Sequence, residues 1–180
     1  MDNGASNYRR FLDGEESAFE EIMEEYRRGL TLFIDRYVSD MAAAEDIAID
    51  VFTYILLCPG KYNFKTSLKT YLYMLGRSRA LDYVRKRSRV ELAPLEVLEG
   101  EEPPPEESVF ASERKKLVRG AVEKLPREMR EAVYLFYFEE LSYEETAKVM
   151  KKTKKQIDNL LYRAKEKLRD IIGKDGELLL

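Results

Sequence analysis

The stretch LSYEETAKVMKKTKKQIDNLLYRAKEKL, residues 141 to 168, decides the fold of the C-terminal part of this chain. Ser142 is followed three residues later by Glu145, and the same spacing recurs further on, at Thr153 and Gln156. Each pair is spaced as a capping box, in which two side chains satisfy free backbone amides at a helix start. Apolar residues follow at three- and four-residue steps. The stretch therefore predicts a short helix, a tight basic turn and a longer helix, the helix-turn-helix pattern that reads DNA.

The outward face at the start of the second predicted helix is rich in cations and amides, the residue types that contact DNA in the major groove. The outward residues there are Lys154, Lys155, Gln156, Asp158 and Asn159, with Lys151 and Lys152 in the preceding turn, and Asp158 is the acidic side chain among them. The alternative interpretation is a helical hairpin with a solvated lysine face. Residues outside this stretch must distinguish the two.

Composition restricts the class of protein. The 180 residues are 44% hydrophobic and 36% charged, which suits one or two small helical domains. Cys58 is the only cysteine and histidine is absent, which excludes an internal disulfide, a cysteine or histidine zinc site and a histidine-based triad. There is no phosphate-binding glycine loop, no membrane-spanning apolar run and no apolar signal core. We therefore expect a cytoplasmic protein without membrane insertion, enzymatic activity, cofactor or metal.

Charge divides the chain into four segments. Residues 1–60 carry 5 basic and 13 acidic side chains (−8), whereas residues 61–89 carry 9 basic and 1 acidic (+8). Residues 90–112 carry 7 acidic and no basic side chains (−7) and hold four of the six prolines, a composition typical of a flexible linker. Residues 113–180 carry 17 basic and 13 acidic (+4). The linker is either a solubilising spacer or a mimic of nucleic acid in a basic channel.

The apolar periodicity of the N-terminal segment predicts three long helices, over residues 17–38, 43–57 and 66–87. Ser17 and Glu20 have the capping-box spacing at the first of them. The third helix interleaves aromatic residues with cations. Cations bind phosphate and aromatic rings stack on unpaired bases, which suits DNA that is being opened. The alternative is that the rings lie at the edge of the core and the cations form a solvated face.

Two further helices, over residues 109–124 and 126–138, are predicted between the linker and the helix-turn-helix, with Pro126 as a first helical residue. Met129, Val133, Phe136 and Tyr137 form the expected apolar stripe of the second. The sequence thus predicts an all-α protein of two small helical domains, residues 1–89 and 113–180, joined by a flexible acidic linker. The C-terminal domain is expected to be a compact four-helix domain.

Three motifs in this order resemble the bacterial RNA polymerase sigma factors, specifically the two-domain extracytoplasmic-function (ECF) group. They are AEDIAIDVF at residues 44–52, LKTYLYMLGRSRALDYVRK at residues 68–86 and EKLPREMREAVYLFYFEELSYEETAKVM at residues 123–150. The resemblance extends over about residues 17–172. It implies a promoter-specificity subunit that binds core RNA polymerase, recognises two elements of promoter DNA and helps to melt the duplex.

The resemblance also implies roles for individual residues. The expected contacts to core polymerase are Glu45, Asp46, Ile49, Asp50 and Phe52. The residues expected to capture and melt the downstream (−10) element are Tyr62, Lys65, Lys69, Tyr71, Tyr73, Arg77, Ser78, Arg79, Tyr83, Arg85 and Lys86. The residues expected to read the upstream (−35) element are Lys152, Thr153, Lys154, Lys155, Gln156, Asn159 and Arg163. The linker would thread toward the active-site and RNA-exit channels, and an anti-sigma factor is an implied partner.

Some positions depart from the family pattern. Ile49 replaces a usual glutamine, Ser78 a common asparagine and Tyr71 a common tryptophan. Lys151 replaces the usual turn glycine, a position that often needs a positive φ, and Asp158 replaces an often basic residue. Two other functions remain open at this point, a conventional helix-turn-helix regulator and a sigma-like adaptor or decoy without promoter activity.

Overall fold

The computed structural model describes residues 3–90, 118 and 120–173, and it divides the chain into two compact units, Met1–Gly100 and Glu101–Leu180. Within the described residues every regular element is helical and none is a strand, which confirms the all-α fold. Residues 91–112 of the predicted linker lie outside the described residues. The two units are described separately below.

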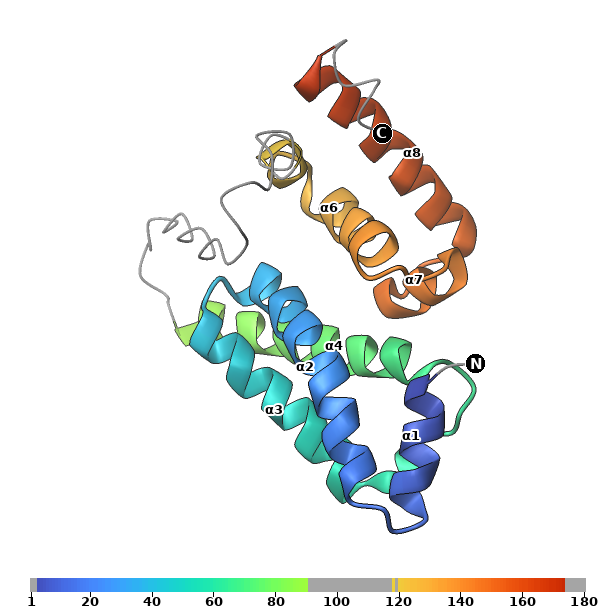
Figure 1. Cartoon of the computed structure of the whole chain (residues 1–180). Coiled ribbons are helices and arrows are strands. Elements are labelled where there is room, and N and C mark those ends of the chain that lie inside the picture. Colours follow the sequence, from blue (N-terminus) through green and yellow to red (C-terminus); the bar gives the residue numbers. More distant parts are fainter. Residues whose placement is uncertain (1–2, 91–117, 119, 174–180) are drawn as a thin grey trace, which may run out of the picture. The chain divides into compact units, whose positions relative to one another are not determined.

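In its described residues, 3–90, the first unit is built from four α-helices and one short 3₁₀ turn (Figure 1). Helices α2 and α3 pack side by side, and α4 packs against both, while α1 lies against the start of α2. Their bounds are α1 Asn3–Leu12, α2 Ser17–Val38, α3 Met41–Leu57, η1 Pro59–Lys61 and α4 Leu68–Val90.

The three predicted N-terminal helices are present, with small shifts at their starts. Helix α3 begins at Met41 because the Asp40 side chain accepts a hydrogen bond from the Ala43 amide at 3.1 Å, as an N-cap does. Helix α4 begins at Leu68 because the Thr70 amide donates to the Ser67 hydroxyl oxygen at 3.2 Å. Local capping chemistry therefore sets both boundaries.

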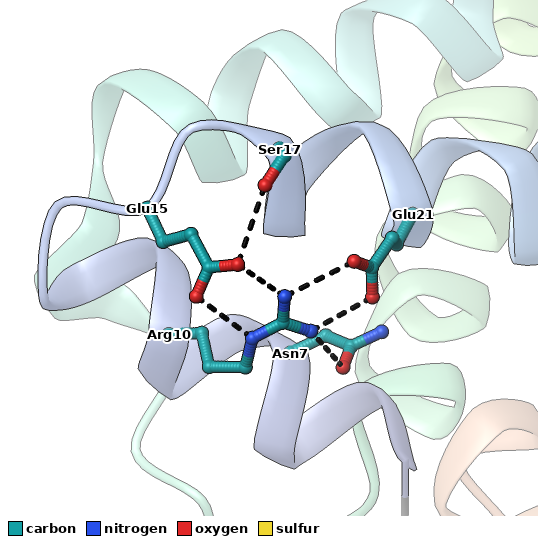
Figure 2. Close-up of polar contacts among 5 residues, drawn as sticks. All are labelled: Asn7, Arg10, Glu15, Ser17 and Glu21. Carbon is teal, nitrogen blue, oxygen red and sulfur yellow. Dashed lines mark hydrogen bonds and ion pairs between the residues drawn. The ribbon is translucent and has the colours of Figure 1, made fainter.

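Helix α1 was not predicted, and its presence changes the start of α2. The expected capping box at Ser17 and Glu20 is wrong, because α2 begins after Glu16 with no side-chain cap. The Ser17 hydroxyl donates instead to Glu15 Oε1 at 3.3 Å. Arg10 of α1 holds that same Glu15 carboxylate, as Figure 2 shows, so a link from α1 through the turn residue Glu15 to Ser17 replaces the local cap.

Part of the core of the first unit lies where α2 and α4 meet. Leu30, Ile34 and Leu72 are fully buried there. Gly76 of α4 permits a close helix approach, because a Cβ at this position would lie 2.8 Å from Leu30 Cδ1 and 3.3 Å from Ile34 Cδ1. The side of α4 that carries Gly76 is therefore packed without room for another methyl group.

The second unit contains the helix-turn-helix and the helix before it (Figure 1). Residues 118 and 120–123 are also helical, whereas most of the predicted helix over residues 109–124 lies outside the described residues. Helix α8 packs against α6 and α7. The bounds are α6 Arg127–Val133, the π-helical turn η2 Tyr134–Phe138, α7 Tyr143–Met150 and α8 Lys154–Ile172.

The π-helical turn corrects part of the predicted apolar stripe. Met129 and Val133 are buried as expected, but Phe136 is only half-buried and Tyr137 is 58% exposed. Because a π-turn holds one more residue than an α-turn, it rotates the residues that follow it away from the expected face. Leu135 takes the buried position instead.

Candidate nucleic-acid interface

The turn of the helix-turn-helix has the local structure that its sequence predicts. Ser142 with Glu145 forms a complete capping box at the start of α7, and Thr153 with Gln156 forms another at the start of α8. Lys151 ends α7 in the left-handed region, with φ 54° and ψ 45°, which is the positive φ expected from the usual turn glycine. These three features fix where α8 begins.

The predicted upstream-element residues lie together at the start of α8 and along its outward side. Thr153, Lys154, Lys155, Gln156, Asn159 and Arg163 are exposed, and Lys152 is half-buried. The opposite side of α8 is fixed in the core by Ile157, Leu161, Ala164 and Leu168. The side chains of Thr153 and Gln156 also form the capping box, so they set the helix start.

Two of these lysines already have acidic partners within the protein. Lys154 Nζ lies 2.5 Å from Glu144 Oε1, and Lys152 Nζ lies 2.8 Å from Glu128 Oε1. The Glu144 contact raises the pKa of Lys154, and the same hydrogen bond lowers the pKa of Glu144. A phosphate that binds Lys154 must therefore compete with the Glu144 carboxylate.

The predicted downstream-element residues, all on α4 or just before it, divide into three groups by burial. Lys65, Ser78, Arg85 and Lys86 are exposed, Lys69, Tyr71, Arg77, Arg79 and Tyr83 are half-buried, and Tyr62 and Tyr73 are buried. The Tyr73 ring lies 5.0 Å from the Phe33 ring in the core and is 1% exposed. For Tyr73 the structure therefore matches the core interpretation of these aromatic residues.

Two of the half-buried cations of α4 lie against aromatic rings. The Arg79 guanidinium lies 5.0 Å from the centre of the Tyr54 ring, and Lys69 Nζ lies 5.8 Å from the centre of the Tyr73 ring. Such contacts orient a cation while leaving part of it open to solvent. Arg85 is paired with Asp82 at 3.0 Å within the same helix. The outward side of α4 is thus a basic surface with several side chains held in place.

The predicted polymerase-binding residues lie on α3. Glu45, Asp46, Ile49 and Asp50 are exposed, whereas Phe52 is 2% exposed and belongs to the core. Ile49 is 44% exposed, and Leu56 and Leu57 extend this apolar surface with exposed fractions of 41% and 72%. Sequence reasoning missed these two leucines, although Leu56 follows Ile49 at a helical spacing of seven.

The segment between α3 and α4 carries an aromatic cluster that sequence reasoning did not place. The rings of Tyr62 and Tyr71 are stacked at 5.2 Å, and Phe64 lies 4.6 Å from Tyr62. Tyr8 of α1 reaches the same cluster. Burial raises the pKa of Tyr71, with further contributions from Tyr54.

Comparisons with known proteins agree with this arrangement. Residues 22–90 match the family model for Sigma-70 region 2, and residues 115–168 match the model for Sigma-70, region 4. The RNA polymerase sigma-H factor of Pseudomonas aeruginosa is 27% identical over 168 residues, which cover 87% of each chain. The ECF RNA polymerase sigma factor SigM of Bacillus subtilis is 26% identical over 157 residues, or 86% of this chain and 95% of the relative.

The fold matches solved structures as well. The sigma factor RpoE from Bartonella quintana, solved in complex with the anti-sigma factor NepR, aligns with a TM-score of 0.68 and 21% identity, over 87% of this chain and 98% of that one. In the described part of this chain no helix is long and apolar enough to cross a membrane. The two region models account for most of the sequence, and so the chain belongs to the sigma-70 family of RNA polymerase sigma factors, in the ECF group.

Proposed function

We propose that this sigma factor docks on core RNA polymerase through the outward side of α3, defined by Glu45, Asp46, Ile49 and Asp50. In this proposal the basic surface of α4 and the segment before it engage the downstream promoter element, and α8 reads the upstream element. The observation that supports it best is the separation of charge within the first unit. An acidic face on α3 and a basic face on α4 suit two different partners, one cationic and one anionic.

Each face has the chemistry that its proposed partner requires. Carboxylates beside an exposed isoleucine provide orientation and an apolar contact on a protein surface. On α4 the Arg79 guanidinium lies against the half-buried Tyr54 ring, which provides phosphate binding next to a group on which a base can stack. An anti-sigma factor is the second proposed protein partner, because the Bartonella quintana relative was solved with one.

The first experiment tests docking. Asp46→Lys with Asp50→Lys places like charge against a basic partner, so we expect core polymerase binding to weaken by more than about tenfold. Glu24→Lys with Glu25→Lys is the matched control, because it makes the same charge change at exposed positions of α2. The measurements are copurification with core polymerase and transcription from a genomic fragment library. Intact promoter-directed transcription in the α3 variant would show that the docking face is assigned wrongly.

The second experiment tests promoter reading by α8. Lys154→Ala with Lys155→Ala removes two exposed cations at the start of the helix. We expect weaker binding of holoenzyme to its promoter and a salt slope reduced by about one for each lost phosphate contact. An unchanged slope would assign both lysines to a solvated face. Specific binding to duplex DNA without polymerase would favour a conventional regulator instead.

A further inference from the structure

The segment at residues 58–67, between α3 and α4, holds an aromatic residue in a strained conformation. Phe64 has φ 58°, in the left-handed region that non-glycine residues with bulky side chains rarely adopt. Such a conformation persists only where the surroundings impose it, and it is concentrated at functional sites. Within the segment, Asn63 Oδ1 accepts a hydrogen bond from the Lys65 amide at 3.1 Å, and the Tyr62 hydroxyl donates to the Thr66 carbonyl at 2.7 Å.

Helix α1 supplies a hydrogen bond that the backbone of this segment lacks. In a regular helix the amide of residue 59 would donate to the carbonyl of Ile55, but Pro59 has no amide hydrogen. The Tyr8 hydroxyl takes its place and lies 3.0 Å from the Ile55 carbonyl oxygen and 3.1 Å from that of Pro59. A single hydroxyl hydrogen is thus shared between the end of α3 and the beginning of the segment.

The same helix contacts the aromatic residues of the segment. The Tyr8 ring is fully buried and meets the Tyr62 ring edge to face, with centres 5.3 Å apart. The Tyr8 and Phe64 rings are 6.1 Å apart. The Arg9 guanidinium covers the strained Phe64, 4.9 Å from its ring centre. Two consecutive residues of α1 therefore hold both aromatic side chains of the segment.

Helix α1 is in turn held on α2 by the cluster in Figure 2. The Arg10 guanidinium donates to Glu21 at 2.8 and 3.1 Å and to Glu15 Oε2 at 2.9 Å, with a further contact to Glu15 Oε1. It also donates to Asn7 Oδ1 at 3.3 Å. A planar guanidinium shared between two carboxylates fixes direction as well as distance. Helix α1 is thus anchored on one side and contacts the segment on the other.

We propose that α1 is a brace that sets the conformation of residues 58–67, with Tyr8 as a positioning residue for the capture of unpaired promoter bases. This inference rests on the proposed function, which assigns Tyr62 and the following residues to the downstream element. A flipped base requires a preformed pocket and stacking partners, so the conformation of the segment determines which bases are accepted. Neither Tyr8 nor Arg9 lies within residues 22–90, the part that matches the region 2 model.

The test uses Tyr8→Phe in the full chain, reconstituted with core polymerase. This change keeps the ring and removes the shared hydrogen bond. Tyr37→Phe is the matched control, because it removes a phenol hydroxyl from α2 of the same unit without changing α1 or the segment. The probe is a labelled single-stranded oligonucleotide with the non-template downstream element of a promoter that wild-type holoenzyme selects from a genomic library. Versions with single base substitutions measure discrimination.

We expect Tyr8→Phe to lower the ratio of affinities for matched and substituted oligonucleotides by about tenfold, because the buried Ile55 carbonyl and the part-buried Pro59 carbonyl lose their shared donor. The affinity for core polymerase should be unchanged. A purely structural role for Tyr8 would reduce the folded fraction, which lowers both oligonucleotide affinities equally and leaves their ratio intact. Tyr37→Phe should retain the wild-type ratio.

Arg9→Ala keeps the inference testable if Tyr8→Phe fails to fold, because Arg9 is exposed. It should lower the ratio by about threefold, the size of one exposed cation–π contact. An unchanged ratio in Arg9→Ala, or in a folded Tyr8→Phe, overturns the brace. If the wild-type chain binds core polymerase but the resulting holoenzyme does not discriminate among the oligonucleotides, the downstream-element assignment itself is overturned.

Discussion

Substitution of Gly76 by alanine should loosen the packing of α4 on α2. The added Cβ would lie 2.8 Å from Leu30 Cδ1 and 3.3 Å from Ile34 Cδ1, and the first distance is shorter than real Cβ contacts. Leu30 and Ile34 are both 0% exposed, so neither side chain can move into solvent. The helices must separate or the side chains must leave their preferred rotamers.

Two effects of opposite sign decide the magnitude. Alanine gains about 1 kcal/mol over glycine in a helix interior. Overpacking a filled core costs about 1–3 kcal/mol, and full burial of both neighbours places this site toward the upper end. We therefore expect a net loss of about 1 kcal/mol, which for a unit of this size lowers its unfolding temperature by about 4–8 °C.

The change in unfolding temperature is measured on the full chain, by calorimetry and by circular dichroism, in the thermal unfolding transition of the first unit. Gly120→Ala is the matched control, because Gly120 is also helical but its added Cβ would meet nothing within 4 Å. The control should be stabilised by up to about 1 kcal/mol. If Gly76→Ala is as stable as wild type or more stable, the close contact between α2 and α4 is not as described. Because α4 carries the proposed downstream-element residues, its displacement should also weaken binding of the single-stranded probe.

Three further outcomes are expected. Glu144→Gln should strengthen promoter binding and increase its salt slope by about one, because DNA phosphate no longer competes with the Glu144 carboxylate for Lys154. Glu140→Gln makes the same charge change at an exposed site and should have neither effect. Lys151→Gly should stabilise the second unit by about 0.5–1 kcal/mol because φ is 54° there, and Lys148→Gly within α7 should destabilise it by about as much, both measured by thermal unfolding. Burial, with smaller effects of Tyr71 and Cys58, raises the pKa of Tyr8 from 10.0 to about 12. The folded state thus binds the proton of the Tyr8 hydroxyl more tightly than the unfolded state does. The stability that the protonated hydroxyl contributes is therefore complete below pH 10 and is lost as pH rises through 12. The stability difference between wild type and Tyr8→Phe should shrink over that range, and a constant difference in denaturant titrations would contradict the assignment.

Local patterns predicted the elements that local chemistry determines. Both capping boxes of the helix-turn-helix follow from residues three positions apart, whereas the positive φ of Lys151 and the exposed residues of α3 were expected from the family resemblance. The sequence NGASNYRRFL of α1 has no cap signal, and Tyr8 finds its hydrogen-bond partners 47 and 51 residues away. A hydrogen bond between residues so far apart in the sequence cannot be predicted from the spacing of apolar residues.

In the candidate interfaces, too, the sequence predicted exposed cations but not the partners that they find on other helices. The pattern placed cations on the outward side of α8, but the partner of Lys154 lies ten residues earlier on another helix. The π-turn added one residue per turn where the periodicity assumed an α-helix, and so the exposure of Tyr137 was missed. For Tyr73 the sequence left two interpretations open, and only its contact with Phe33 of another helix distinguishes them.

The Arg10 cluster has a consequence for how ionic strength acts on this protein. Its side chains are 39–47% exposed, so dissolved salt screens the attraction that holds α1 on α2. If α1 braces residues 58–67, added salt loosens the downstream-element segment before any phosphate is involved. The salt dependence of promoter opening would then contain a contribution from the protein itself. Counting phosphate contacts from that slope alone would overestimate their number.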